Sequence, residues 1–248
     1  MKFDASQLCC DFNYSENRHM QNLEKFTAIY QRACERKGGP QILDATLNKP
    51  LPNKLLSQVG DDRFLAEFSK KVFQSGFVWR VVRNKWPDFE RVFFDFNIEK
   101  ILLLPDEMLE KKATDPSIIR NYTKVRTIRD NAIMIDLVAR EQGSFAKFVA
   151  DWPSDDIIGL WAYLKKHGAR LGGNTGPYSL RTLGKDTFLL SNDVVGYFSK
   201  RNIISGSHQS KRSLTAIQQS FNELQQQSGR SLQELSMIIS KSVGDNYQ

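Results

Sequence analysis

Apolar residues recur at the spacing of an α-helix along most of this chain, and the alternation typical of β-strands is nearly absent. The segment 117–141 is the clearest case, because Ile128, Ile135 and Ala139 fall on one helical face. We expect further helices at 21–36, 61–86 with an interruption at residue 76, 88–95, 97–103, 105–112, 145–151, 155–167, 175–183, around 194–198, 213–227 and 232–243. The pattern therefore predicts an all-α protein.

Capping and breaking residues mark several of the expected helix ends. The Gly-Gly-Pro sequence at 38–40 is expected to end the first helix, and Pro87 the second. Ser154 is placed to cap the helix expected at 155–167. Ser231 and Glu234 have the spacing of a capping box, which predicts a helix start at 232.

The composition, 40% hydrophobic and 25% charged, is that of an ordinary soluble globular protein. No apolar run approaches the roughly 18 residues of a membrane span, and residues 1–19 lack the apolar core of a signal peptide. Cys9, Cys10 and Cys34 are too few for a disulfide framework. We therefore expect a cytoplasmic protein, associated with the nucleoid if its source is bacterial. The formal net charge of +7 fits a partner that carries phosphates, without requiring one.

The patterns predict three regions. Residues 1–19 are polar and are expected to form a disordered extension. Residues 20–205 are expected to form the main helical domain. The polar stretch 205–211 is typical of a linker, and residues 206–248 are expected to form a helical C-terminal extension.

A glycine-rich turn separates two of the expected helices within the segment 164–183. Four glycines between residues 168 and 176 permit positive φ angles and let a phosphate approach the main chain closely. The helix after the turn directs its first N–H groups toward whatever lies there. The candidates for phosphate contact are Lys165, Lys166, Arg170, Gly172, Gly173, Asn174 and Thr175. The residues alone leave open an ordinary helix–turn–helix connection with solvated lysines.

A series of sequence blocks extends from about residue 61 to residue 197. The blocks are 74–79, 89–93, 96–100, 118–125, 131–132, 164–179 and 192–196. Their order and spacing resemble those of the DNA-3-methyladenine glycosylase I family, a branch of the helix-hairpin-helix DNA glycosylases. The resemblance implies a two-lobed helical fold of that superfamily, with double-stranded DNA as the partner.

The resemblance also implies an enzyme of base-excision repair. Such an enzyme turns a damaged base out of the duplex and hydrolyses the N-glycosidic bond of alkylated purines such as 3-methyladenine. Trp79 would be the wall on which a flat cationic base stacks, with Gln74 among the base-binding residues and Gly76 and Phe77 at the mouth of the pocket. The reaction would be monofunctional and need no cofactor. Pro177 stands where relatives that form a Schiff base carry a lysine.

Several positions depart from the family's pattern. The family's pocket glutamate aligns with Lys71, which would repel a cationic base unless burial removed its charge. Two zinc ligands align with Asp193 and Tyr197 and the other two have no counterpart, so no metal is expected. The catalytic aspartate of other helix-hairpin-helix glycosylases aligns with Ser191. We therefore take Asp193 and Lys71 as candidate catalytic residues, with Glu67 as a further carboxylate nearby in sequence.

Three further possibilities remain open. Arg120 and Lys124 lie at the start of a long expected helix and are candidates for phosphate contact. The change to Lys71 also favours an alternative: a non-catalytic DNA-binding protein of the same fold that recognises damaged or structured DNA. A third possibility is a glycosylase whose Lys71 meets a neutral or oxidised base. No obligate protein partner is indicated.

Overall fold

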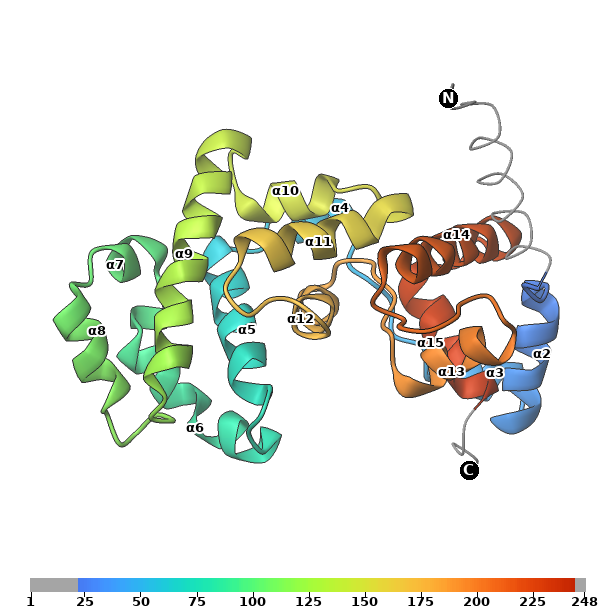
Figure 1. Ribbon diagram of the computed structural model, residues 1–248, viewed down its shortest axis with the longest axis horizontal. Helices are drawn as coiled ribbons and strands as arrows, with labels where there is room; N and C mark the ends of the chain where they lie inside the picture. The colour runs from blue at the N-terminus through green and yellow to red at the C-terminus, as the bar shows by residue number, and fades with distance from the viewer. Residues whose placement is uncertain (1–21, 244–248) are drawn as a thin grey trace, which may run out of the picture. The chain divides into compact units, whose positions relative to one another are not determined.

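The computed structural model describes residues 22–243, and every regular element within this range is a helix (Figure 1). The predicted all-α class is therefore confirmed. The expectations for residues 1–19, including Cys9 and Cys10, lie outside the described residues. Within 22–243, no helix combines the length and the apolar character needed to cross a membrane.

The chain divides into two compact units. Unit 2 comprises residues 50–186, and the described part of unit 1 comprises residues 22–49 and 187–243. Unit 2 contains α4 (Asn53–Leu56), α5 (Asp61–Gln74), α6 (Trp79–Val92), η1 (Phe94–Phe96), α7 (Ile98–Leu102), α8 (Asp106–Ala113), α9 (Tyr122–Gln142), α10 (Phe145–Asp151), η2 (Ser154–Asp156), α11 (Ile157–His167) and α12 (Thr175–Leu183). Unit 1 contains α2 (Phe26–Arg36), α3 (Pro40–Ala45), α13 (Asn192–Lys200), α14 (Lys211–Ser228) and α15 (Leu232–Ser242).

The core of unit 2 forms around α5, which packs against α9, α12, α6 and α10. The rings of Phe64, Phe68 and Phe145 meet edge to face, with centroids 5.4 to 6.2 Å apart. Phe73 contacts Phe89 in the same manner at 4.6 Å. These rings are fully buried, so α5 is held on several sides and its C-terminal end has a fixed position.

Two expected helix ends differ in the structure. Pro87 lies inside α6, where the ring of Trp86 stacks on Phe89 and its indole N–H donates to Glu90. Pro87 is exposed, so the carbonyl that it leaves without an amide partner can be hydrated. The first helix ends at Arg36, as expected from the Gly-Gly-Pro sequence, and Pro40 then begins α3, because its fixed φ suits a first helical turn. Ser154 begins the short η2, and the helix expected at 155–167 starts only at 157.

Three lysines in unit 2 place their ammonium groups on helix C-terminal carbonyls. Lys124 donates to the carbonyl of Val72 at 2.7 Å. It also donates to the carbonyls of residues 73 and 75, and all three acceptors lie at the C-terminal end of α5. Lys112 donates to the last carbonyl of α6 at 2.6 Å, and Lys185 to carbonyls at the end of α10. A cation is favourable at the negative end of a helix. Burial nonetheless lowers the pKa of all three side chains, to about 8 for Lys185.

Unit 1 joins the N-terminal helix α2 to the C-terminal helix α15. The guanidinium of Arg32 donates to the carbonyl of Ser242, and that of Arg36 to the carbonyl of Lys241, each at 3.2 Å. The predicted capping box of Ser231 is present and begins α15. Segments far apart in the sequence therefore form one body.

A network of charged side chains surrounds Tyr197, one of the two positions that align with zinc ligands. Arg32 donates to both carboxylate oxygens of Glu24, at 3.0 and 2.8 Å, and Arg201 also pairs with Glu24. The Arg201 guanidinium lies 4.0 Å from the centre of the Tyr197 ring, which is fully buried. At this position an aromatic ring and an ion-pair network connect α13 to the segment before α2.

Glu24 makes the stability of unit 1 depend on pH. Burial raises the pKa of Glu24, but the hydrogen bonds and charges of Arg32 and Arg201 outweigh burial and leave it below 4.5. Its contribution is therefore complete above the unfolded pKa and is lost as the pH falls through the lower folded pKa. We expect Glu24→Gln to reduce the free energy of unfolding by about 1.5 kcal/mol at pH 7.

Urea unfolding of both proteins at a series of pH values checks this expectation. The difference between wild type and Glu24→Gln should shrink steadily below pH 4.5. A difference that stays constant down to pH 2.5 would show that the carboxylate charge does not stabilise the unit.

Candidate functional site

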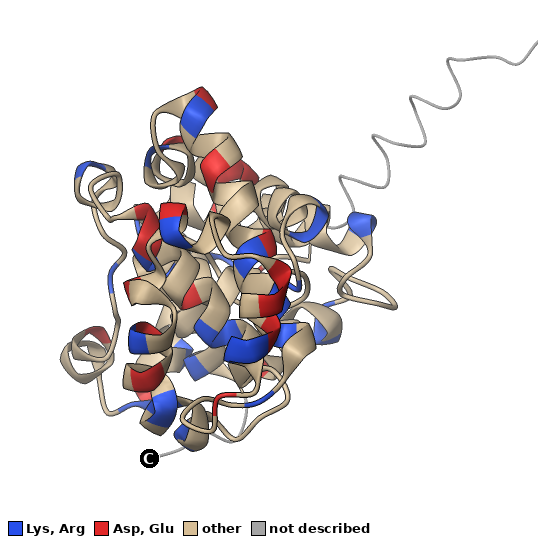
Figure 2. Ribbon diagram, turned by 90° about the vertical axis from the view of Figure 1, so that its left-hand side faces the viewer, with Lys and Arg blue, Asp and Glu red and all other residues tan. Residues whose placement is uncertain are grey.

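The predicted hairpin forms between α11 and α12 in unit 2. The side chains of Lys165, Lys166 and Arg170 are exposed around it, as are Gly173 and Asn174. Basic and acidic residues are interspersed along the helices in view in Figure 2. Charge alone therefore does not identify a DNA-binding surface, and the main chain of the hairpin becomes the more specific feature.

The hairpin main chain is fixed by internal hydrogen bonds that leave its tip unused. The amide of Gly176 donates to Leu171 at 3.1 Å, and that of Thr175 to Gly172 at 3.3 Å. Within the part of the chain that the structure describes, the amides of Gly173 and Asn174 donate to no protein acceptor. Two adjacent exposed N–H groups before a helix form a suitable site for an anion.

Glycine is required at two points of this turn for different reasons. Gly173 has a φ of +60°, and a Cβ there would meet nothing within 4 Å. A Cβ on Gly176 would lie 2.6 Å from the carbonyl oxygen of Leu171, which is main chain and cannot move aside easily. Gly176 thus permits close packing inside the hairpin, whereas Gly173 permits the backbone turn at its exposed tip.

Asn131, which sequence reasoning did not place in the site, holds the hairpin against α9. Its side-chain amide donates to the carbonyl of Ala169 at 3.2 Å, and the Ala169 amide donates to its Oδ1 at 2.7 Å. Asn131 is fully buried. Two signals in the sequence point to Asn131: it belongs to the block at 131–132, and it is a polar residue on an otherwise apolar helical face.

The two basic residues predicted at the start of α9 have different surroundings. Arg120 is exposed just before the helix, next to Asn121, whose side chain caps it by accepting from the amide of Lys124. The Lys124 side chain is 6% exposed, and its ammonium donates to the carbonyls at the end of α5. The structure therefore gives Lys124 an internal role in place of the predicted phosphate contact.

Trp79 opens α6 and is half exposed. The Lys71 ammonium lies 5.7 Å from the centre of its ring. The same ammonium pairs with Glu67 Oε1 at 3.2 Å, and the two side chains are only 15% and 12% exposed. We call Glu67, Lys71, Gln74 and Trp79 the Trp79 cluster. The structure thus brings the predicted aromatic wall and the predicted catalytic lysine together.

The remaining residues predicted to bind the base lie at the junction of α5 and α6. Gln74 is buried, and its Oε1 has no hydrogen-bond donor among the described residues. Gly76 has a φ of +96°, which turns the chain between the two helices. The ring of Phe77 lies under the Lys124 ammonium at 4.7 Å. Lys124 therefore helps to set the position of the segment that leads to Trp79.

Asp193, the other candidate catalytic residue, belongs to unit 1. It lies in the first turn of α13 and accepts a hydrogen bond from Ser240 of α15 at 3.0 Å. This contact gives it a structural role in joining the two helices. Its catalytic role stays a prediction.

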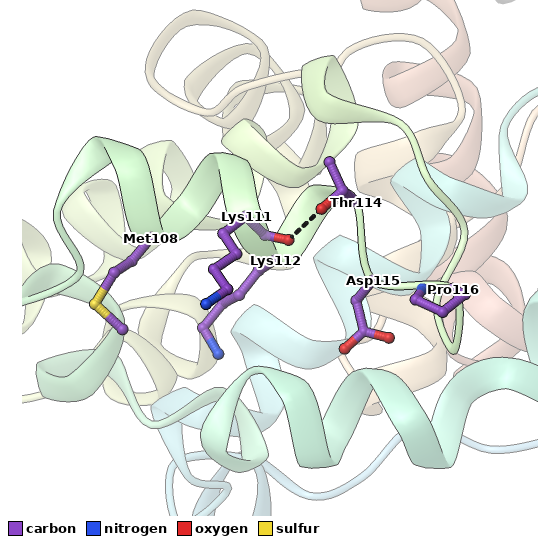
Figure 3. Close-up of a pocket in the computed structure, with 6 residues that line it drawn as sticks. All are labelled: Met108, Lys111, Lys112, Thr114, Asp115 and Pro116. Carbon is purple, nitrogen blue, oxygen red and sulfur yellow. Dashed lines mark hydrogen bonds between the residues drawn. The ribbon is translucent and has the colours of Figure 1, made fainter.

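A separate pocket of about 450 Å³ lies beside α8 in unit 2 (Figure 3). Its lining includes the side chains of Lys111, Lys112 and Asp115, and none of the residues predicted for the site. Within 22–243, no group of three or more His, Cys, Asp or Glu residues could hold a metal ion.

Known proteins resemble this chain in sequence or structure. A family model described as methyladenine glycosylase matches residues 57–175. The 8-oxoguanine DNA glycosylase of Methanocaldococcus jannaschii is 16% identical, over 86% of this chain and 92% of that one, with a TM-score of 0.52. A complex described as 8-oxoguanine glycosylase/lyase from the same organism, with a 15mer DNA containing 8-oxoguanine, is also 16% identical, over 86% and 95%, with a TM-score of 0.50.

The 3-methyladenine DNA glycosylase I of Staphylococcus aureus is 20% identical, over 57% of this chain and 82% of that one, with a TM-score of 0.46. No curated protein matches the sequence. At these identities, the two archaeal structures show that the chain has a helix-hairpin-helix DNA glycosylase fold.

Proposed function

Because the chain belongs to the methyladenine glycosylase family of helix-hairpin-helix DNA glycosylases, we propose that it is a monofunctional enzyme of base-excision repair. It hydrolyses the N-glycosidic bond between a damaged base and its deoxyribose and leaves an abasic site. The observation that carries this proposal is the half-exposed ring of Trp79 beside the paired charges of Glu67 and Lys71. The substrate class that the family suggests is an alkylated purine such as 3-methyladenine.

Duplex DNA is held by the hairpin in this proposal. The unused amides of Gly173 and Asn174 donate hydrogen bonds to a phosphate oxygen, and Lys165, Lys166 and Arg170 surround it with positive charge. Phosphate contacts of this kind fix the position of the protein on DNA without reading its sequence. They are suited to an enzyme that must find damage in any sequence.

The flipped base stacks on Trp79. Stacking of a base on an aromatic side chain contributes about 1–3 kcal/mol and requires an exposed ring face. Trp79 is 51% exposed, whereas Trp161 is 9% exposed and belongs to the core. Pro177, in the first turn of α12, supplies no amine, which supports hydrolysis by water without a Schiff base.

Release of free bases from modified DNA tests the function. Wild-type protein is incubated with duplex DNA that carries both cationic and uncharged modified bases, and the released bases are separated and measured. We expect release by wild type, a loss of about thirtyfold in Trp79→Ala, and a loss of no more than about threefold in Trp79→Phe, which keeps an aromatic face.

The alternative function predicts another result. A non-catalytic DNA-binding protein would release no base, yet it would bind duplex DNA with an affinity that falls as salt rises. That outcome would replace the enzyme with a protein that recognises damaged or structured DNA. Equal release by wild type and Trp79→Ala would remove Trp79 from the site.

A further inference from the structure

Three polar side chains of the Trp79 cluster form one stripe on α5. Glu67, Lys71 and Gln74 are separated by four and three residues, so they project from neighbouring points on one helical face. Each is largely removed from solvent, with Gln74 only 6% exposed. Buried polar groups of this kind are normally fully hydrogen-bonded.

One ammonium already occupies the vicinity of the aromatic wall. Lys71 Nζ lies 5.7 Å from the centre of the Trp79 ring and 3.2 Å from Glu67 Oε1. A cation attracted to the ring face would therefore meet the like charge of Lys71, whose ion-pair partner is Glu67, although Glu67 Oε1 accepts no hydrogen bond among the described residues. The two charges of the pair cancel in sum, but the group beside the ring is the ammonium, which opposes a cationic methylated purine and does not oppose an uncharged base.

The hydrogen-bonding groups of the stripe complement one another. Gln74 Oε1 is buried without a donor among the described residues, so an N–H group of a ligand would satisfy it. The Lys71 ammonium has three N–H groups and can donate to a further acceptor besides Glu67. A base that carries a carbonyl oxygen and a ring N–H on one edge satisfies both.

We propose that the Trp79 cluster selects an uncharged modified base with a carbonyl and an N–H on one edge over a cationic N-methylpurine. This inference rests on the proposed glycosylase function and names the substrate class of the same site. Lys71 acts as a specificity-determining residue, and Gln74 reads the N–H.

The chemistry also distinguishes the two classes of base. When the bond from C1′ to the base nitrogen breaks, its electron pair stays on the base. A cationic base leaves neutral, whereas an uncharged base leaves with negative charge. An ammonium beside the ring stabilises that charge. Water supplies the oxygen that bonds to C1′. For the uncharged base the water proton ends on the base nitrogen, whereas for the cationic base it is released to solvent, so Lys71 is unchanged over either reaction.

Single-turnover excision from matched duplexes tests the proposal. The duplexes are identical except for one base, which is hypoxanthine, 8-oxoguanine or the cationic 7-methylguanine. We expect wild type to excise one or both uncharged bases at least tenfold faster than 7-methylguanine. Lys71→Gln keeps an N–H donor without the charge, and it should reverse this preference by at least tenfold. Gln74→Leu should slow excision of the uncharged bases at least threefold, because it removes the acceptor for their N–H group.

Lys70→Gln is the matched control, because Lys70 lies on the same helix over a different ring, that of Trp86 at 5.3 Å. It should leave the preference unchanged. Faster excision of 7-methylguanine by wild type, unaltered in Lys71→Gln, would overturn the inference while the glycosylase function stands. If no base is released, calorimetric binding of 9-methylhypoxanthine and of the 3,9-dimethyladeninium cation decides. Tighter binding of the cation overturns the inference, and tighter binding of the uncharged base supports it.

Discussion

A Gly173→Asp variant is expected to bind duplex DNA about ten- to a hundredfold more weakly than wild type at low salt. Gly173 lies at the exposed tip of the hairpin, and a Cβ added there would meet no other atom within 4 Å. The new carboxylate would therefore point into the space that a phosphate occupies in the proposed complex. Fluorescence anisotropy with a labelled duplex measures the loss, which should diminish as salt rises because the repulsion is screened.

Gly173→Asn is the matched control for this variant. Asparagine has nearly the same size as aspartate and also tolerates the positive φ of +60° at this position. Its affinity should stay within about threefold of wild type, because it adds no charge. An equal loss in both variants would assign the effect to the backbone. No loss in either would place DNA binding away from the hairpin.

A Lys124→Met variant is expected to lose about 3 kcal/mol of the free energy of unfolding, because it leaves buried carbonyls without a donor. The ammonium of Lys124 donates to carbonyls at the end of α5, and the side chain is buried. Methionine has a similar length and fills the space without a hydrogen bond. Urea unfolding followed by circular dichroism measures the difference.

The same variant should also reduce base excision, because Lys124 lies over Phe77 in the segment that leads to Trp79.

Lys165→Met is the control for removal of a lysine charge in the stability measurement, since Lys165 is exposed on α11. Its stability should remain within about 0.5 kcal/mol of wild type. If Lys124→Met is as stable as Lys165→Met, the carbonyls at the end of α5 are satisfied in another way.

The helices that depend on local sequence were predictable. The capping box at Ser231 and the glycine after residue 183 each determine a helix end through groups within a few residues. Pro87 was assigned wrongly, because the contacts of Trp86 with Phe89 and Phe96 come from packing that no local rule contains. Tertiary contacts therefore decided where α6 ends.

The arrangement of the site was predictable only in part. The order of the sequence blocks placed Trp79 and Lys71 at positions that the structure brings within 5.7 Å. The i,i+4 spacing of Glu67 and Lys71 permits their ion pair. The role of Lys124 could not be predicted, because a lysine near a helix start is usually solvated. Its burial depends on carbonyls that lie about fifty positions earlier in the chain.

In the proposed complex with DNA, the internal lysines affect how binding responds to ions in solution. Lys112, Lys124 and Lys185 direct their donors at carbonyls, so they add to the formal charge without reaching a phosphate. Displacement of condensed ions from DNA depends on the number of phosphates that are actually contacted. In the proposed complex, the ionic sensitivity of binding therefore depends on the exposed basic side chains that reach phosphates, such as those at the hairpin and Arg120, and it is weaker than the basic isoelectric point suggests.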